Sequence, residues 1–262
     1  MATIGIFDSG SGGLSVYREL VKVLPKEQYH YFSDNAHCPY GEKSPLYIRR
    51  RGRYITEFLL ETGADIIVVA CNTATAAAIA TLRAEYPDVP FVGMEPAVKP
   101  AALGTQSGVI GVLATAGTLK GSKYLNTRGR FQDEVTIVEH VGQGFVELVE
   151  KGILDGPEAE AVVRASLEPL LAAGADTIVL GCTHYPFLQP LIERLAGPGV
   201  RVIDPAPAVA RRAVHVLEEE GVSIGQGPFS VQLHASGDPR PLERIFALLS
   251  RDSQTPENYT LI

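Results

Sequence analysis

One segment of this chain of 262 residues occurs twice in similar form. Residues 63–73 read GADIIVVACNT, and residues 174–184 read GADTIVLGCTH. In each copy an apolar run rich in β-branched residues ends at a cysteine, and such a run is typical of a buried strand. The repeat therefore predicts two similar halves, each with one thiol, Cys71 or Cys182, at the end of a strand.

The repeat extends beyond the cysteines. Residues 4–9 resemble residues 110–115, and the short segment 95–97 resembles 204–206, in the same order and at nearly the same spacing. Between these segments, short apolar runs alternate with amphipathic stretches, which is typical of parallel sheets joined by helices. We therefore expect an α/β fold of two parallel-sheet, flavodoxin-like domains related by pseudo-twofold symmetry, with the active site in the cleft between them.

Individual elements follow from the same pattern. Strands are predicted at residues 4–7, 29–33, 66–70, 91–93, 109–113, 136–139, 178–181, 201–203 and 229–235. Helices are predicted at residues 14–24, 46–61, 75–85, 144–151, 158–173, 186–195, 206–220 and 241–250. Two Pro-containing stretches, 95–100 and 204–207, are interpreted as linkers. The predicted domains are residues 1–94 plus 208–262, and residues 95–207.

Composition excludes several classes of protein. The net charge of −7 and pI near 5.4 argue against nucleic acid or an anionic membrane as the main partner. The one dense basic run, residues 49–53, is interpreted as a solvated helix face. With neither a membrane-spanning run nor an export signal in the sequence, we expect a cytoplasmic protein. Three cysteines are an odd set for a disulfide framework, and the histidines lack zinc-site spacing, so no metal is expected.

A glycine-rich turn follows the first predicted strand. Residues 8–13 read DSGSGG, and such a turn allows close approach of the backbone to an anion at the start of a helix. The turn lacks the glycine and lysine spacing of nucleotide-binding fingerprints. It is interpreted either as an anion site or as a tight structural turn. Asp8 at the end of the strand either caps the helix or faces a ligand.

The two cysteines point to proton transfer at a carbon atom. A lone cysteine at a strand end is more often a small buried hydrophobe, but the duplication favours a shared role. Amides at the following helix starts are expected to lower the thiol pKa. His184 is expected to assist Cys182, and Asp8 to assist Cys71, unless the histidine is merely structural. Two thiols on opposite faces of a stereocentre, exchanging the roles of acid and base, suit a racemase or epimerase.

Five ordered motifs carry a family resemblance. They are DSGSGGL at 8–14, PYG at 39–41, ACNTA at 70–74, GCTHYP at 181–186 and SGDP at 236–239. Together, from residue 3 to about residue 250, they resemble the glutamate racemases of the cofactor-independent aspartate/glutamate racemase superfamily. The resemblance implies a two-domain α/β enzyme without a cofactor that interconverts L- and D-glutamate and supplies D-glutamate for peptidoglycan synthesis.

The same resemblance implies roles for individual residues. Cys71 and Cys182 correspond to the acid/base pair, the first acting on D-glutamate and the second on L-glutamate. The assisting catalytic residues are Asp8, Glu150 and His184. The implied substrate contacts are Asp8, Ser9, Tyr40, Gly41, Asn72, Thr73, Thr115, Thr183 and His184. The histidine at 184 favours glutamate over aspartate, whose racemases more often carry an acidic residue there.

The chain departs from the family at Gly142 and Gln143, where members frequently have Cys-Pro. Glu150, a few residues on, therefore has a second interpretation as an exposed helix carboxylate. Cys38 lies near the expected site without a distinct chemical task. Base rates for oligomers predict a homodimer.

Other functions were weighed. A dinucleotide enzyme could use the glycine-rich turn with Asp34 as the ribose acid, but it leaves the second cysteine unexplained. A two-lobed amino-acid-binding protein needs no thiols and usually carries an export signal. A thiol redox protein would need cysteines able to join. Nothing suggests a Schiff-base lysine for pyridoxal phosphate, and racemisation of aspartate is the nearest rival.

Overall fold

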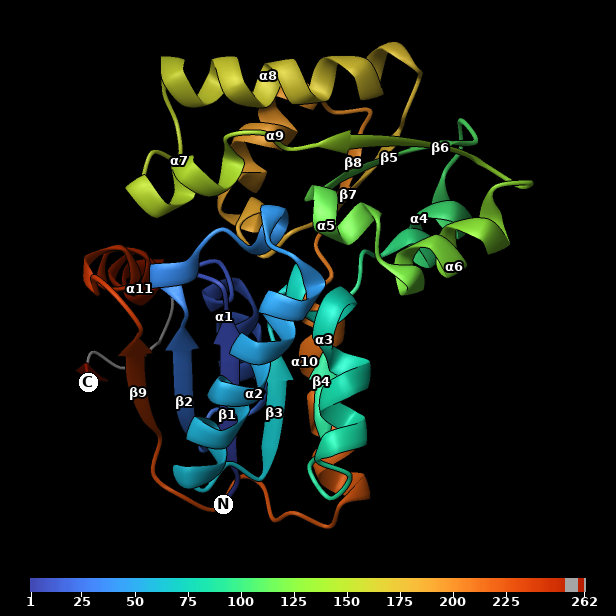
Figure 1. The fold of residues 1–262 in the computed structure, drawn as a ribbon. Coiled ribbons are helices and arrows are strands. Elements are labelled where there is room, and N and C mark those ends of the chain that lie inside the picture. Colours follow the sequence, from blue (N-terminus) through green and yellow to red (C-terminus); the bar gives the residue numbers. More distant parts are fainter. Residues whose placement is uncertain (253–258, 262) are drawn as a thin grey trace.

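The strands form two separate parallel sheets in the computed structural model, which describes residues 1–252 and 259–261 (Figure 1). The first sheet has the order β10-β9-β2-β1-β3-β4, and the second the order β6-β5-β7-β8. The first contains β1 (Thr3–Asp8), β2 (Gln28–Ser33), β3 (Ile66–Val69), β4 (Phe91–Gly93), β9 (Ser230–Ala235) and β10 (Tyr259–Leu261). The second contains β5 (Val109–Ala114), β6 (Thr136–Val141), β7 (Thr177–Gly181) and β8 (Arg201–Ile203).

Equivalent strands occupy equivalent places in the two sheets. The order β2-β1-β3-β4 of the first half returns as β6-β5-β7-β8 in the second. The strands that precede the two cysteines, β3 and β7, therefore lie beside the first strand of their own half, β1 and β5. The α/β class with two parallel sheets is confirmed.

Helices cover both faces of each sheet (Figure 1). On the first sheet, one face packs against α1 (Leu14–Val23), α10 (Ala206–Glu219) and α11 (Arg240–Asp252), and the other against α2 (Pro45–Glu61) and α3 (Asn72–Glu85). On the second, one face packs against α4 (Val98–Gly104) and α6 (Ser122–Phe131), and the other against α7 (Phe145–Lys151), α8 (Pro157–Ala172) and α9 (Gln189–Ala196). Shorter elements are α5 (Ala116–Leu119) and the 3-10 helices η1 (Asn35–His37), η2 (Tyr40–Glu42) and η3 (Tyr185–Leu188).

The apolar strands are buried on both faces, which explains their continuous rather than alternating hydrophobicity. Ile66 and Val68 of β3 join the core under α1 and α10, whereas Ile67 and Val69 join the core under α2 and α3. Successive side chains of a strand point to opposite faces, so both cores need apolar residues.

The chain passes from the first half to the second after β4 and returns to the first half after β8. There α10 packs against α1, and β9 pairs with β2. The exact domain division at residues 94 and 208 stays a prediction. No helix in the described part of the chain is long and apolar enough to cross a membrane.

Two expectations for the second half were wrong. Residues 95–100 were predicted as a linker, but α4 begins at Val98 and includes Pro100 in its first turn, where a missing N–H costs no hydrogen bond. No element was predicted over 116–131, where α5 and α6 lie. In α6 only Tyr124 is buried, so the apolar periodicity that would identify the helix is missing.

Candidate active site

The two cysteines lie at the carboxyl ends of the equivalent strands β3 and β7. Cys71 is 4% exposed and Cys182 is 6% exposed. Cys71 also forms the N-cap of α3, with its sulfur accepting a hydrogen bond from the Ala74 amide at 3.4 Å. A negative charge on Cys182 contributes to raising the pKa of Cys71, so the two sulfurs belong to one electrostatic site.

Asp8, at the end of β1, links the two halves of this site. Its Oδ2 atom accepts hydrogen bonds from the Gly13 amide at 2.9 Å and from the Thr183 hydroxyl at 3.4 Å. Its carboxylate also shares a hydrogen bond with the Cys71 thiol. Burial raises the pKa of Asp8, against the lowering effect of a charged His184. Asp8 therefore contacts one thiol directly and the neighbour of the other.

The expected lowering of the thiol pKa is wrong for Cys71. Burial and then the Asp8 carboxylate raise the pKa of Cys71 well above its ordinary value, although the Ala74 amide opposes them as the helix start predicts. One amide of a capped helix is too weak to offset full burial beside a carboxylate. A thiolate formed at this position is therefore an unusually strong base.

His184 stands between Cys182 and Glu150. Its Nδ1 atom lies 3.8 Å from the Cys182 sulfur, and its Nε2 atom lies 2.7 Å from Oε1 of Glu150. Burial lowers the pKa of His184, but hydrogen bonds to Cys182, Cys38 and Glu150 outweigh burial and raise the pKa well above its ordinary value. The imidazole is thus held in its charged form beside the second thiol.

Glu150 belongs to the same network. Its side chain is 18% exposed, so the interpretation as an exposed helix carboxylate is wrong. It accepts hydrogen bonds from the amide and the hydroxyl of Ser11 at 2.7 and 3.0 Å. Burial raises the pKa of Glu150, but the bonds from His184 and Ser11 hold it below its ordinary value. Its catalytic role stays a prediction.

The glycine-rich turn receives the protein's own carboxylates. The amides of Ser11 and Gly13 donate to Glu150 and Asp8, so both anions that the turn binds come from the chain itself. The glycines make room for the neighbouring side chains, because a Cβ atom on Gly12 would lie 2.2 Å from Nδ1 of His184.

Small polar residues around Cys71 are available to a ligand. Asn72 is 3% exposed, and neither its amide nitrogen nor its oxygen has a hydrogen-bond partner. Buried polar atoms without partners are rare, so the Asn72 amide is free to form hydrogen bonds with a ligand. The hydroxyls of Thr73 and Thr115 lie 2.8 Å apart and join the two halves. The Cys71 thiol donates to Ser9 Oγ at 3.9 Å.

One predicted contact is differently placed. The hydroxyl of buried Tyr40 donates to Asp34, which Arg51 holds with two bonds of 2.9 and 2.7 Å. Its next residue, Gly41, packs against Thr115. The Tyr40 hydroxyl is thus engaged within the protein. Arg51 is also an exception to the expected solvated face of the basic run.

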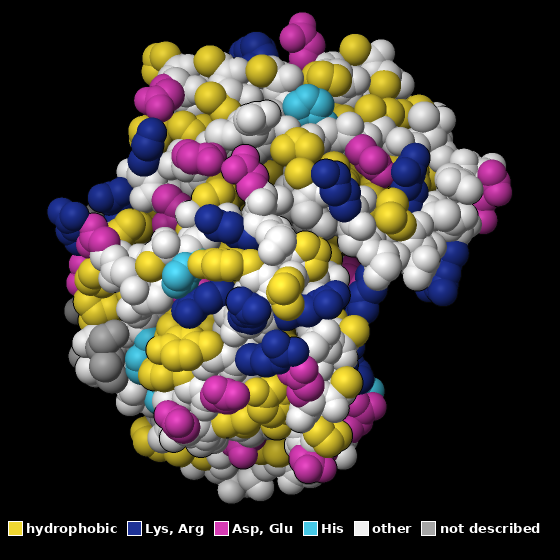
Figure 2. Space-filling model, viewed as in Figure 1, with side chains coloured by type: hydrophobic (Ala, Val, Ile, Leu, Met, Phe, Trp, Pro, Cys, Tyr) yellow, Lys and Arg dark blue, Asp and Glu magenta, His cyan; other side chains and the backbone are white. Residues whose placement is uncertain are grey.

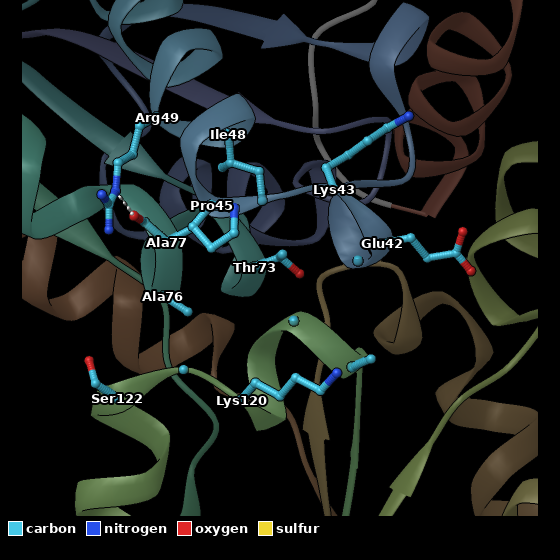
Figure 3. A pocket seen from close by; sticks show the side chains of 14 residues that line it. Glu42, Lys43, Pro45, Ile48, Arg49, Thr73, Ala76, Ala77, Lys120 and Ser122 are labelled. Atoms are coloured by element: carbon cyan, nitrogen blue, oxygen red, sulfur yellow. Dashed lines mark hydrogen bonds between the residues drawn. The ribbon is translucent and has the colours of Figure 1, made fainter.

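A cavity of about 560 Å³ lies between the first and second halves of the chain (Figure 3). Among its lining residues are Gly41 and Thr73, which are predicted substrate contacts, and the cations Lys43, Arg49 and Lys120. Figure 3 shows Thr73 and Lys120 from different halves of the chain on the two sides of this space. Figure 2 shows Lys and Arg side chains gathered on the same face of the molecule. With three cations and one carboxylate, Glu42, in its lining, the cavity favours an anionic ligand.

The fold and the site together define a class of enzyme. Two buried thiols, each with its own proton partner, end equivalent strands of two facing α/β halves. Such an arrangement can take a proton from one face of a carbon atom and supply one to the other. The class of enzyme that this arrangement fits is a racemase.

Comparison with known proteins gives the family. Residues 4–213 match the family described as Asp/Glu/Hydantoin racemase, and the chain belongs to this family. It is 48% identical over 248 residues to a curated glutamate racemase of Stutzerimonas stutzeri, covering 95% of this chain and 94% of the relative.

Solved structures agree. Glutamate racemase isoform RacE1 from Bacillus anthracis superimposes with a TM-score of 0.87 at 30% identity, over 100% of this chain and 96% of that one. Escherichia coli glutamate racemase, solved with L-glutamate and the activator UDP-MurNAc-ala, superimposes with a TM-score of 0.86 at 34% identity, over 100% and 98% of the two chains.

Proposed function

We propose that this protein is a glutamate racemase that interconverts L- and D-glutamate by proton transfer through Cys71 and Cys182, without a cofactor. The observation that carries the proposal is the pair of buried thiols with separate partners, Asp8 for the first and His184 for the second. The identity with glutamate racemases over nearly the whole chain supports glutamate as the substrate.

In this proposal each thiol serves one face of the substrate, as the family resemblance implies. Cys182 as a thiolate removes the α-proton of L-glutamate, and the Cys71 thiol then delivers its proton to the opposite face of the same carbon. The product is D-glutamate, and the thiol and thiolate have exchanged places. In the reverse reaction the Cys71 thiolate removes the α-proton of D-glutamate, and the Cys182 thiol delivers its proton to the opposite face. When Cys71 is protonated before D-glutamate binds, Asp8 first accepts the proton of the thiol.

The surroundings offset the weak acidity of the α-proton. Burial makes the Cys71 thiolate a stronger base, because the raised pKa brings the thiol closer to the pKa of the carbon acid. Burial also raises the pKa of Asp8, so its carboxylate is a stronger base than an exposed one. The unpartnered amide of Asn72 can donate to a substrate carboxylate and stabilise charge that develops there.

Single thiol variants test the proposal. The purified protein with L-glutamate and no cofactor should lose optical rotation as D-glutamate forms. Cys71→Ser and Cys182→Ser should each nearly abolish this reaction without changing the melting temperature. Cys38→Ser is the matched control, because it removes the third thiol and should leave the reaction intact. Full activity in either of the first two variants would refute the mechanism.

The cellular role and the assembly extend this proposal. D-glutamate is needed for peptidoglycan, so the gene should restore growth of a bacterium that requires external D-glutamate. We further propose a cytoplasmic homodimer, on the base rate for symmetric oligomers. Sedimentation at several protein concentrations tests the dimer, and a monomer throughout the range would overturn it.

A further inference from the structure

Cys38 is a thiol that the proposed reaction leaves without a task. It follows η1 and is partly buried. It shares a hydrogen bond with His184. A Cβ atom placed on Gly10 would lie 2.3 Å from Oε1 of Glu150 and 3.0 Å from the Cys38 sulfur. The thiol therefore lies over the glycine-rich turn, close to the carboxylate that holds His184.

The three side chains bring together the donor atoms that a thiophilic metal ion requires. The Cys38 sulfur, a carboxylate oxygen of Glu150 and an imidazole nitrogen of His184 all lie within 4.8 Å of one another. Zinc binds these atoms at about 2.0 to 2.3 Å, which places donors around one ion roughly 3 to 4 Å apart. Movements of about 1 Å in the side chains would therefore close the site.

A separate cavity reaches two of the three side chains of this cluster, Cys38 and Glu150. It has a volume of about 270 Å³, and Cys38 and Glu150 line it together with Glu147 and Asp238. Among the described residues that line it, none is a Lys or Arg. Asp238 pairs with Arg240 and Glu150 with His184, so the additional negative charge that favours a cation in this lining comes from Glu147. Water in the cavity can complete a four-coordinate shell.

We propose that Cys38, Glu150 and His184 form an inhibitory site for a thiophilic divalent cation, with zinc as the expected ion. On binding, zinc replaces the proton of the Cys38 thiol and any proton on the coordinating nitrogen, and both leave to solvent. Sulfur and imidazole donors select zinc over magnesium or calcium, which prefer oxygen. The sequence could not indicate this site because its ligands come from three distant segments.

The inhibition follows from what the ion would occupy. A zinc ion on His184 and Glu150 replaces their direct hydrogen bond of 2.7 Å and competes with the Ser11 donors for the carboxylate. His184 then no longer passes charge or protons to Cys182. This consequence rests on the proposed racemase function, whereas zinc binding itself does not.

Two measurements test the inference. Binding of zinc alone to the metal-free protein is followed by competition with a chromogenic zinc indicator, and racemisation is followed at rising zinc concentration. We expect one zinc ion per chain. Cys38→Ser should weaken binding, and raise the zinc concentration for half inhibition, by at least about tenfold, since even outer-shell changes at zinc sites have effects of that size. The activity of this variant without zinc is the reference for its own inhibition curve.

The matched control is Cys71→Ser, which should bind zinc as the parent protein does. Cobalt provides a second readout, because a thiolate-to-cobalt absorption band should appear in the parent protein and be lost in Cys38→Ser. Equal zinc affinity in the parent protein and Cys38→Ser would overturn the proposal, as would loss of zinc binding in Cys71→Ser. Zinc binding that depends on Cys38 in a protein without racemase activity would uphold the site and refute the proposed function.

Discussion

Nε2 of His184 lies 2.7 Å from Oε1 of Glu150, although the two residues come from different elements. Glu150 lies near the C-terminus of α7, and His184 lies in the turn between β7 and η3. The same carboxylate accepts both donors of Ser11 from the glycine-rich turn of the first half. One side chain therefore holds the imidazole beside Cys182 and ties the two halves together.

Replacement of Glu150 by Gln should slow the proton-transfer step at Cys182, the thiol proposed to act on L-glutamate. The neutral amide no longer stabilises the imidazolium, so the pKa of His184 falls and proton transfer at Cys182 slows. We expect kcat/KM to fall about 10- to 100-fold, below the effect of losing a general base outright. The fall must be equal in both directions, because the two enantiomers are equally stable.

A deuterium isotope effect shows which of the two proton-transfer steps, at Cys71 or at Cys182, has become slower. In Glu150→Gln the primary deuterium isotope effect on kcat/KM should increase with α-deuterated L-glutamate and decrease with α-deuterated D-glutamate. The reason is that proton transfer at Cys182 becomes the step that limits the rate in both directions. An unchanged pair of isotope effects would show that Glu150 does not act through His184.

Asp8→Asn should change the two isotope effects in the opposite directions to Glu150→Gln. Asp8 shares a hydrogen bond with the Cys71 thiol, and an amide cannot accept its proton. The primary isotope effect should then increase with α-deuterated D-glutamate. The same direction of change as in Glu150→Gln would contradict the assignment of one partner to each thiol.

Gly12→Ala should disrupt the site by steric contact. The added Cβ would lie 2.2 Å from Nδ1 of a buried imidazole, so His184 must move. Forced overpacking of this kind costs about 1–3 kcal/mol of unfolding free energy, and racemisation should fall with it. Gly129→Ala in α6 is the control, since an added Cβ meets nothing within 4 Å there. Denaturant titration of both variants measures the difference, and equal stability would refute the contact.

Acid should destabilise the protein through a buried histidine pair. Nδ1 of His30 on β2 lies 3.3 Å from Nε2 of His234 on β9, and their rings stack. Burial, and then the charge of His30, lower the pKa of His234 to about 4. The unfolded chain binds protons near pH 6.5 while the folded chain resists them until about pH 4, so stability is lost as the pH falls through this range.

Melting temperatures between pH 7 and 4 test this. Replacement of His234 by Gln should flatten the decline, because the side chain no longer gains a proton on unfolding. A decline as steep as that of the parent protein would place the acid sensitivity elsewhere.

The duplicated strand segments were enough to predict the fold and the cysteines. A fully apolar run such as 66–69 has to be buried on both faces, and the repeat shows that 177–181 shares its place. The resemblance added Glu150, but its contact with Ser11 lies 139 positions away and no local pattern encodes it. The direction of the Cys71 pKa shift was predicted wrongly because burial depends on the whole fold.

Deuterium incorporation during the first turnovers tests the two-thiol mechanism most directly. L-glutamate is incubated with the protein in heavy water, and both enantiomers are separated before equilibrium. Transfer from opposite faces predicts deuterium at Cα of the D-glutamate product and ordinary hydrogen in the remaining L-glutamate. Early deuterium in the recovered L-glutamate, or D-glutamate that retains its original hydrogen, would contradict the account, because a single base would then serve both faces.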